Sequence, residues 1–581
     1  MVAAHRCMLF SDEPEGYGRK VRARLVSRPP PDKMATGGLA RESVMERTLT
    51  DYHLLVVSDL HLSEGRGPKG GKFSKNEDFF FDEEFARFLA YYQDARRWHG
   101  AKWHLIINGD FLDFLQVIAQ DDGPSASRPV PHHGDLGRPC GEQETVGKLA
   151  IIAGGHRLLF ESLAGFVAAG NLLTIIKGNH DVEFHYSGVR AAFLAELEAA
   201  FRRRLAGDPD WGKGKEIDNM GAETVRFSDW FYFEKDLLWV EHGNRYEGFN
   251  SFRYWLSPLL PGIPGWPPER KDEIDLPFGS LFVRYLFNRI ESAEPFADNI
   301  KPATRFVRWL LRKHPVTALA FIFRDGRYML RRVQRAWADV PPEAWEVRNR
   351  QHEARLRELA GDSGIGISRL FEVDLLRERS VLKEPDSRAK VLRAVLHPRI
   401  FFPAIVLAVS AVVLSVLFVA ANLLAGVVPA FLRETLIEPF IDLAFRVAPW
   451  AVLLVVVAAL VIGLRWLLTE EERKEPSYLK RKADRICELL GVRYVIMGHT
   501  HDAELHPVGE SGGLREEYYN TGTWTTVFSE EERLIRKPVE FVFVQGLRAG
   551  DGIRLKLLEW NDGAEEPRLL KLFRDGKKAG H

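Results

Sequence analysis

Short apolar runs recur along the chain, and each leads directly into polar residues. In the most distinctive one, the apolar run 172–176 is followed by Lys177 and Gly178 and then by Asn179, His180 and Asp181. Short apolar, β-branched runs that end at glycine predict buried strands. Runs of the same form cover 54–57, 104–107, 237–240 and 494–497. In an open α/β sheet, ligands and catalytic groups collect at the carboxyl ends of strands, so the pattern predicts an α/β fold with a site there.

The side chains that follow these runs are oxygen and nitrogen donors with no thiolate among them. Taken alone, any one of these polar clusters is also what a solvated turn would show. Five such clusters together favour a metal site, and the number of donors fits two metal ions. Oxygen and imidazole ligands suit manganese, iron or zinc, and they argue against a structural zinc site made of cysteines.

The ordered clusters resemble the calcineurin-like metallophosphoesterase superfamily, whose blocks run D-x-H, G-D-x-x-D, G-N-H-D/E, H and G-H-x-H. In this sequence the blocks occupy 59–61, 109–113, 178–181, 242 and 498–501. The resemblance covers the chain from about Tyr52 to His242 and again from about Val492 to Trp524. It implies an α/β sandwich of two mixed β-sheets flanked by helices.

The resemblance also implies two divalent metal ions, with manganese expected first and iron or zinc as alternatives. The implied ligands of the first ion are Asp59, His61 and His501, and those of the second ion are Asn179, His242 and His499. Asp110 is implied to bind both ions. A hydroxide bridging the ions would be the nucleophile. His180 would protonate the leaving oxygen, and Asp181 would orient the imidazole of His180. Asp113 is expected to fix the site from outside the ligand set.

Composition and charge restrict the setting of this chemistry. The 581 residues leave room for more than one structural unit, and Lys plus Arg equal Asp plus Glu at 80 each. A neutral chain has no overall attraction to nucleic acid, so we expect no nucleic-acid partner. The three cysteines, Cys7, Cys140 and Cys487, form no CxxC pair, which indicates free thiols in a reducing compartment.

Two long segments without any charged residue, 400–432 and 447–464, predict a transmembrane hairpin. Two buried helices of a soluble bundle are the alternative. Because His499 and His501 follow the second segment but must reach Asp59, both flanks have to lie on one side of the membrane. These flanks carry most of the nearby lysines and arginines, so the positive-inside rule places the catalytic domain in the cytoplasm.

The expected organisation contains a catalytic domain in two parts. Its segments are a flexible N-terminal tail at 1–50, the first part of the domain at 51–245, a helical, amphipathic insertion at 246–399, the hairpin at 400–468, the second part at 469–562 and a C-terminal tail at 563–581. The insertion mixes aromatic residues with arginines, which suits a membrane interface or the entrance for a lipid-like anionic substrate. An ordinary helical subdomain with solvated arginines explains it equally well.

Residues that differ from those of known branches of the superfamily narrow the range of expected substrates. Where serine/threonine protein phosphatases carry arginines that grip phosphate, this chain has Phe114 and Lys177, which argues against a phosphoprotein substrate. The chain looks closer to the UDP-diacylglucosamine pyrophosphohydrolase branch, which cleaves a lipid-linked pyrophosphate, although that branch usually has arginine in place of His180. We expect a membrane-anchored hydrolase of a phosphodiester or pyrophosphate bond in a lipid-linked or nucleotide substrate. A phosphomonoesterase, a nuclease and a non-catalytic membrane scaffold are the alternatives.

Overall fold

The computed structural model describes residues 52–67, 71–118, 139–261, 273–284, 288, 342–381, 429, 431, 478–511, 514–526, 539–550 and 552–571. These residues all belong to a single unit, Thr48–His581. The predicted N-terminal tail and residues 572–581 of the predicted C-terminal tail lie outside the described residues, whereas Glu566–Leu569 of that tail form a β-strand. So does the predicted hairpin at 400–468, apart from Pro429 and Phe431.

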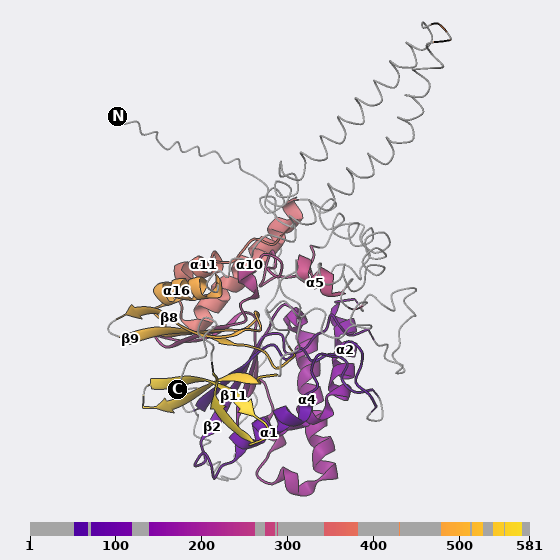
Figure 1. The fold of residues 1–581 in the computed structure, drawn as a ribbon, viewed down its shortest axis with the longest axis vertical. Helices are drawn as coiled ribbons and strands as arrows, with labels where there is room; N and C mark the ends of the chain where they lie inside the picture. Colours follow the sequence, from indigo (N-terminus) through magenta and orange to yellow (C-terminus); the bar gives the residue numbers. More distant parts are fainter. Residues whose placement is uncertain are drawn as a thin grey trace, which may run out of the picture. The chain divides into compact units, whose positions relative to one another are not determined.

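Two mixed β-sheets form the framework, as the resemblance implies (Figure 1). The seven-stranded sheet has the order β12-β11-β10-β1-β2-β3-β4, in which β1 to β4 are parallel and β10 to β12 are antiparallel. Its strands are β1 (Tyr52–Val57), β2 (Lys102–Asn108), β3 (Leu172–Ile176), β4 (Val225–Ser228), β10 (Val542–Ala549), β11 (Gly552–Asn561) and β12 (Glu566–Leu569). The parallel strands direct their carboxyl ends to one edge.

The five-stranded sheet has the order β5-β6-β7-β9-β8. Its strands are β5 (Phe231–Glu234), β6 (Leu238–Glu241), β7 (Tyr494–Met497), β8 (Ala503–Ser511) and β9 (Leu514–Thr521). Strand β6 pairs in parallel with β7, although more than two hundred and fifty residues separate them in the sequence. This pairing joins the two predicted parts of the catalytic domain.

Alternation along the strands divides the core into two layers. In β1, Leu54 and Val56 belong to one cluster of buried side chains, and Leu55 and Val57 belong to another. The first cluster takes residues from both sheets, so it fills the space between them, whereas the second includes the helices. Successive side chains of a strand point to opposite faces, which explains the alternation. A core shared by the two sheets is compatible with the expected sandwich.

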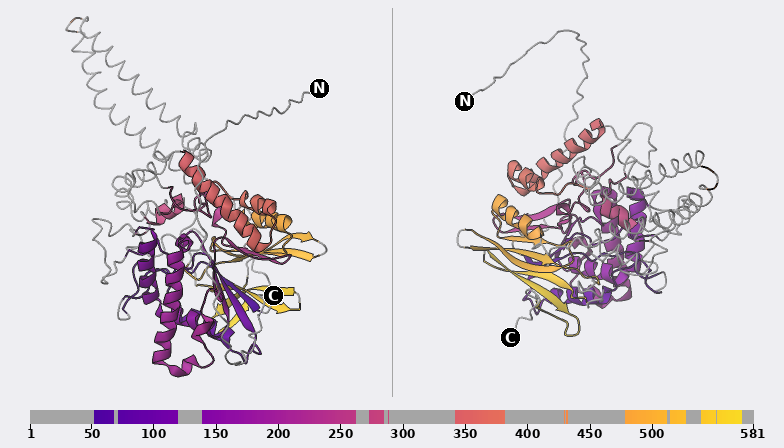
Figure 2. Two further views of the ribbon diagram at one scale, coloured as in Figure 1. Left: turned by 180° about the vertical axis from the view of Figure 1, so that it is seen from behind. Right: turned by 45° about the horizontal axis from the view of Figure 1, so that its top comes forward.

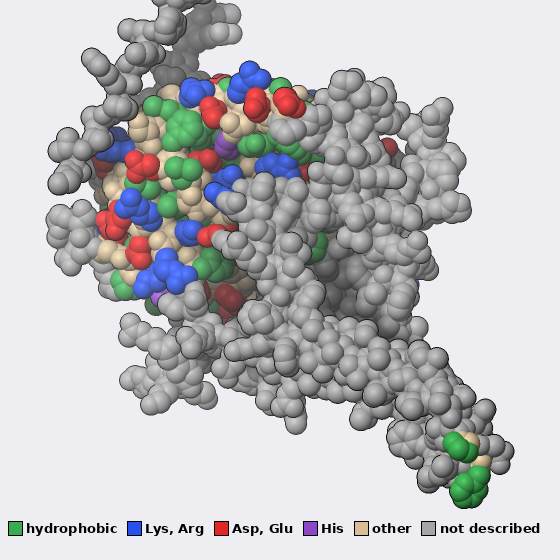
Figure 3. Space-filling view, turned by 90° about the horizontal axis from the view of Figure 1, so that it is seen from above, with side chains coloured by type: hydrophobic (Ala, Val, Ile, Leu, Met, Phe, Trp, Pro, Cys, Tyr) green, Lys and Arg blue, Asp and Glu red, His purple; other side chains and the backbone are tan. Residues whose placement is uncertain are grey.

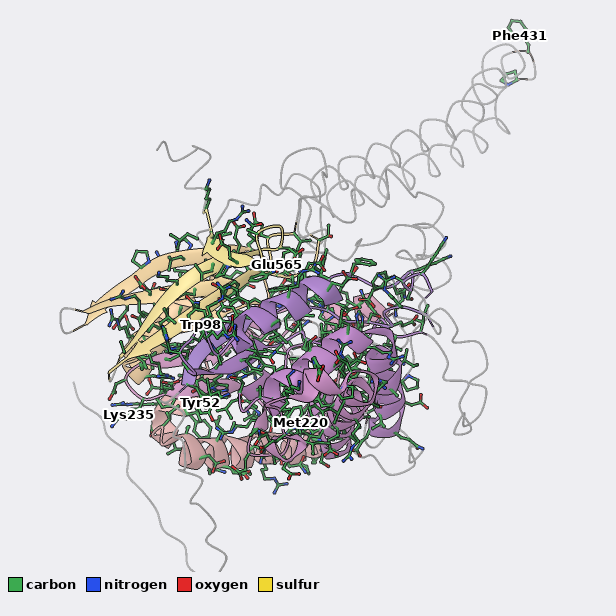
Figure 4. All side chains as sticks on the ribbon, turned by 90° about the horizontal axis from the view of Figure 1, so that it is seen from below. Tyr52, Trp98, Met220, Lys235, Phe431 and Glu565 are labelled. Atoms are coloured by element: carbon green, nitrogen blue, oxygen red, sulfur yellow. The ribbon has the colours of Figure 1, made fainter. Side chains whose placement is uncertain are left out.

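Helices cover the outer faces of both sheets. Beside the seven-stranded sheet lie α1 (Asp82–Gln93), α2 (Glu142–Gly155), α3 (Arg157–Ala168) and α4 (Ser187–Gly207). Helix α16 (Tyr478–Leu490) packs on the five-stranded sheet and contacts α11 (Ile367–Asp374), which follows α10 (Pro342–Ser363) (Figure 2). Aromatic side chains extend the core beyond α1, where Trp98, labelled in Figure 4, stacks on Tyr92 with ring centroids 5.5 Å apart.

None of the described helices is long and apolar enough to cross a membrane by itself. Helices α2 and α3, which meet at a bend of 94°, pass the test of length and composition only when they are taken together. The insertion of the chain into a membrane therefore stays a prediction.

Part of the predicted insertion packs on the predicted catalytic domain. It contributes α5 (Phe278–Phe282), α10 and α11. Arg245 donates to the Asp374 carboxylate of α11, and the other oxygen of Asp374 lies 3.2 Å from Nε2 of His352 on α10. All three side chains are nearly buried. Because Arg245 comes three residues after His242, this network fixes the chain directly behind one of the predicted ligands.

Candidate metal centre

The five sequence blocks meet where strands of both sheets end. In each of three groups of side chains, the potential ligand atoms lie within 4.8 Å of one another. The groups are Asp59, His61 and His501; Asp110, His242 and His499; and His61, Asp113 and His180. The first two groups contain six of the seven predicted ligands. They match the division that the resemblance implies, with Asp110 among the residues of the second ion.

In the first group, two imidazoles and one carboxylate face a common point. Nε2 of His61 lies 3.1 Å from Nε2 of His501. Oδ1 of Asp59 lies 3.3 Å from Nε2 of His501 and 3.8 Å from Nε2 of His61. All three residues are nearly buried, so these nitrogen and oxygen atoms have little access to water. Such a cluster is a suitable cage for one divalent cation.

In the second group, Asp110 reaches toward both halves of the site. Its Oδ2 lies 3.0 Å from Nε2 of His242 and 3.8 Å from Nε2 of His61, which belongs to the first group. The other ring nitrogen of His242, Nδ1, donates to the carbonyl oxygen of Asn108 at 2.9 Å, so Nε2 is the nitrogen left for a metal. Asp110 thus occupies the position that a bridging carboxylate requires.

Asn179 supplies the seventh donor. Its side chain is buried, and Oδ1 has no hydrogen-bond partner among the described residues. The backbone N–H of the next residue, His180, donates to Oδ1 of Asp110 at 2.9 Å, so Asn179 lies next to the second group with an amide oxygen that still needs a partner. A cation bound next to Asp110 and His242 would satisfy this oxygen, and the donor set therefore fits the implied metal ions.

The backbone is strained at most of the predicted ligands. Asp59, His61, Asp110, His499 and His501 have φ angles of 54°, 52°, 49°, 70° and 63°. Residues with a side chain adopt this left-handed region only at a cost, and such outliers concentrate at functional sites. Only nine non-glycine residues of the described chain have positive φ, and five of them are predicted ligands. Packing alone gives no reason for this coincidence.

Three glycines permit the loops to approach one another. A Cβ atom at Gly109 would overlap the His242 ring, and one at Gly178 would overlap the backbone and carboxylate of Asp110. At Gly498, a Cβ would overlap Ser58 and Asp59. Each of these three glycines is therefore required, because a neighbouring predicted ligand occupies the space that a side chain would need.

The surroundings of His180 differ from the prediction. Its Nδ1 lies 2.5 Å from Oδ2 of Asp113, and Oδ1 of Asp113 accepts backbone N–H groups from Leu115 and Gln116. Asp181 instead accepts backbone N–H groups from Gly178 and Phe111, at 2.5 Å and 2.8 Å. The expectation that Asp181 orients His180 is wrong, because its carboxylate is used to join the β2 and β3 loops. Asp113 holds the imidazole.

The electrostatic field of the buried carboxylates favours positive charge at the site. Burial alone would lower the pKa of His242, but the Asp110 and Asp59 carboxylates outweigh it and raise this pKa to about 9. The pKa of His61 is also raised well above its ordinary value, by Asp113, Asp59 and Asp110 against the effect of burial. Burial and the charge of Asp110 raise the pKa of Asp181 to about 7, despite the amides that it accepts. The cluster therefore attracts protons or metal cations.

Asn520 and Thr521, at the end of β9, support the loops that carry His499 and Asp59. The side-chain amide of Asn520 donates to the carbonyl oxygen of Gly498 and to Oγ1 of Thr500, both at 3.0 Å. Oγ1 of Thr521 lies 2.5 Å from Oγ of Ser58, whose hydroxyl also contacts Asp59. These contacts hold the loops of the site from outside the predicted ligand set.

One residue of the site has no signal in the sequence. Oε2 of Glu247 lies 2.7 Å from Nε2 of His499, yet Glu247 belongs to none of the blocks. It follows a single 3₁₀ turn at Asn244–Tyr246, and 41% of its side chain is exposed. Only its proximity to His242 in the sequence could have directed attention to it.

Comparison with protein-family models, with curated proteins and with solved structures gave no match. The interpretation of the site therefore depends on its residues and their geometry.

Proposed function

We propose that the chain is a dinuclear-metal phosphoesterase that hydrolyses a phosphodiester or pyrophosphate bond in a lipid-linked or nucleotide substrate. The observation that supports this proposal most directly is the position of Asp110, whose Oδ2 lies 3.0 Å from His242 and 3.8 Å from His61. A carboxylate between two clusters of imidazoles is suited to two cations about 3.5–4 Å apart, the arrangement of hydrolytic two-metal sites.

The chain's own residues divide the remaining tasks. Bound ions would lower the pKa of a water and neutralise charge on the phosphoryl oxygens. Because Asp113 accepts a hydrogen bond from Nδ1 of His180, the Nε2 atom of that ring is left for the substrate. His180 is 12% exposed in its side chain and is therefore accessible to a leaving group. Nε2 of His180 is the group that would give a proton to the leaving oxygen.

The environment of Lys177 supports a substrate other than a phosphoprotein. Nζ of Lys177 donates to the carbonyl oxygen of Trp255 at 3.1 Å and lies 3.7 Å from the Asp229 carboxylate. The ammonium also lies 4.7 Å from the centroid of the Trp255 ring. Because this charge is buried and engaged elsewhere, it cannot serve as the phosphate grip of protein phosphatases. Phe114, at the other such position, is fully buried and uncharged.

A nuclease of the same superfamily is less well supported. On the face shown in Figure 3, the described lysine and arginine side chains are interspersed with acidic ones and form no broad basic patch. Non-specific binding of nucleic acid depends on such a patch. A non-catalytic scaffold is also less well supported, because nothing in a scaffold role requires the buried donors and strained loops to remain.

Hydrolysis assays on the purified, manganese-loaded protein test the proposal. The substrates are bis(p-nitrophenyl) phosphate, p-nitrophenyl phosphate and a membrane lipid extract whose products are read by mass spectrometry. We expect cleavage of the diester or of a lipid-linked pyrophosphate, abolished in Asp110→Ala. Activity confined to the monoester would contradict the proposed substrate class, and the absence of hydrolysis from a metal-loaded protein would contradict the proposed function.

We further propose that the segment 400–468 anchors the protein to a membrane as a two-span hairpin with the catalytic domain on the cytoplasmic side. The charge-free runs at 400–432 and 447–464 support this proposal, together with the basic residues that flank them. Protease treatment of inverted and right-side-out membrane vesicles is the test. Cleavage of the catalytic domain in inverted vesicles alone is expected, and a protein released by carbonate washing would contradict the anchor.

A further inference from the structure

Glu247 makes a contact with a predicted metal ligand that the proposed chemistry does not use. Its Oε2 lies 2.7 Å from Nε2 of His499, and the same oxygen accepts a hydrogen bond from the side-chain amide of Asn250 at 2.8 Å. His499 is nearly buried, whereas Glu247 is 41% exposed in its side chain. The carboxylate therefore lies at the rim of the site, with one oxygen directed inward by Asn250.

This contact determines which nitrogen of His499 can bind a metal. An ionised carboxylate has no proton to donate, so the proton of the hydrogen bond must be on Nε2 of His499. In the neutral imidazole the lone pair is then on Nδ1, and a ring nitrogen of His499 lies within 4.8 Å of the ligand atoms of Asp110 and His242. His242 has the opposite arrangement, because its Nδ1 donates to Asn108 and leaves Nε2 as the ligand atom. The two histidines of this ion are thus fixed in opposite tautomers by two different acceptors.

We propose that Glu247 is a positioning residue of the second metal ion, and that it acts through His499 by fixing the tautomer that presents Nδ1. The carboxylate also makes the imidazole a stronger donor, because it stabilises the positive charge that the ring acquires on binding a cation. This inference rests on the metal ions of the proposed function. It adds a residue that no sequence block contains and assigns Nδ1 of His499 as the ligand atom.

The backbone around Glu247 explains how the side chain is held. The carbonyl oxygen of Gly248 accepts an N–H from Val381 at 2.8 Å, and that of Phe249 accepts an N–H from Gly279 at 2.8 Å. Ser251 donates to the carbonyl oxygen of Glu378 at 2.7 Å. Gly279 lies in α5, and Glu378 and Val381 follow α11, so two later parts of the insertion hold this turn at its beginning. The insertion thereby sets the position of a carboxylate that contacts the metal centre.

The test measures manganese binding, not turnover. Wild-type protein, Glu247→Gln and Glu247→Leu are titrated with Mn²⁺, and bound ions are followed by calorimetry and by electron paramagnetic resonance, which distinguishes coupled pairs from isolated ions. Gln has the same shape and keeps an acceptor for Nε2, whereas Leu removes the acceptor. Glu504→Gln is the matched control, because Oε2 of Glu504 lies 3.6 Å from Nε2 of His506 in a similar pair outside the metal groups.

We expect Glu247→Leu to bind one of the two ions about 10- to 100-fold more weakly, with a smaller loss in Glu247→Gln and none in Glu504→Gln. At limiting manganese the Leu variant should then give the signal of isolated ions. Two ions bound with wild-type affinity would overturn the role of Glu247 and leave the proposed function intact. Equal weakening of both ions would also overturn it, because a general structural defect affects both. A wild-type protein that binds no manganese would instead contradict the proposed function itself.

Discussion

The Nδ1 atom of His180 lies 2.5 Å from Oδ2 of Asp113, and this contact fixes the imidazole with its other nitrogen free. We predict that His180→Ala keeps both metal ions and loses roughly 10²–10⁴ in kcat on a substrate with a poor leaving group. A good leaving group needs no proton, so the loss on a p-nitrophenyl ester should be much smaller. Rates are measured beside metal content, and unchanged turnover on the poor leaving group would remove His180 from the mechanism.

Separate substitutions of Asp113 and Asp181 should show that the two carboxylates have different roles. Asp113→Asn should lower kcat in the direction of His180→Ala, because the amide holds the imidazole less firmly. Asp181→Asn should instead lower stability by about 1–3 kcal/mol, because its amide group would face the buried N–H of Gly178 or Phe111. Thermal unfolding and kcat are measured for both variants, and the reverse pattern would restore Asp181 as the orienting residue.

Asp110→Ala should lose metal and activity together, because its carboxylate lies between the two ligand groups. Metal analysis after gel filtration should find fewer than two ions per chain, with kcat reduced to background. Glu83→Ala on the exposed surface of α1 is a suitable control, and it should retain its metal ions and its activity. An Asp110→Ala protein that still carries two ions would show that this residue does not bridge them.

Close packing at Gly178 gives a prediction with an internal control. The added Cβ of Gly178→Ala would overlap the backbone and carboxylate of Asp110, so this variant should bind metal more weakly and unfold at a lower temperature. The same substitution at Gly207 meets no atom within 4 Å and should be neutral or slightly stabilising. Equal behaviour of the two variants in metal titration and thermal unfolding would contradict the packing argument.

His156 makes stability depend on pH. Burial alone would lower the pKa of His156, but Glu77 and Asp82, at 3.1 Å and 3.0 Å, raise it to about 10 from an ordinary value of 6.5. Because the folded state holds this proton more tightly, the stabilisation is complete below pH 6.5 and is lost as pH rises toward 10.

The His156→Gln variant checks this contribution. Its unfolding free energy should be lower than that of wild type at pH 6 and should fall less steeply between pH 6.5 and pH 10. Denaturant titrations at several pH values give both slopes. Parallel slopes for the two proteins would show that His156 is not the group that titrates.

Much of the site is predictable from the sequence because its residues follow buried strands. Asp59 follows β1, His242 follows β6, and His499 follows β7, so the ends of the strands bring these side chains together wherever the intervening chain goes. The apolar runs identify those strands to within two residues, for example 237–240 for β6 at Leu238–Glu241. Residues far apart in sequence therefore meet as predicted.

The prediction failed where side-chain direction decides the contact. Asp113 and Asp181 are both acidic and both lie in sequence blocks, and only the paths of their loops determine which one faces His180. Glu247 could not be predicted, because its position depends on backbone hydrogen bonds between its own turn and parts of the insertion that follow thirty or more residues later. Neither relationship has a periodic or compositional signal.

Anomalous scattering from crystals grown with manganese tests the central claim most directly. We predict two peaks about 3.5–4 Å apart on either side of the Asp110 carboxylate, one beside His61 and His501 and the other beside His242 and His499. A protein that is saturated with manganese but shows no peak there, or a single ion bound elsewhere, would contradict the account.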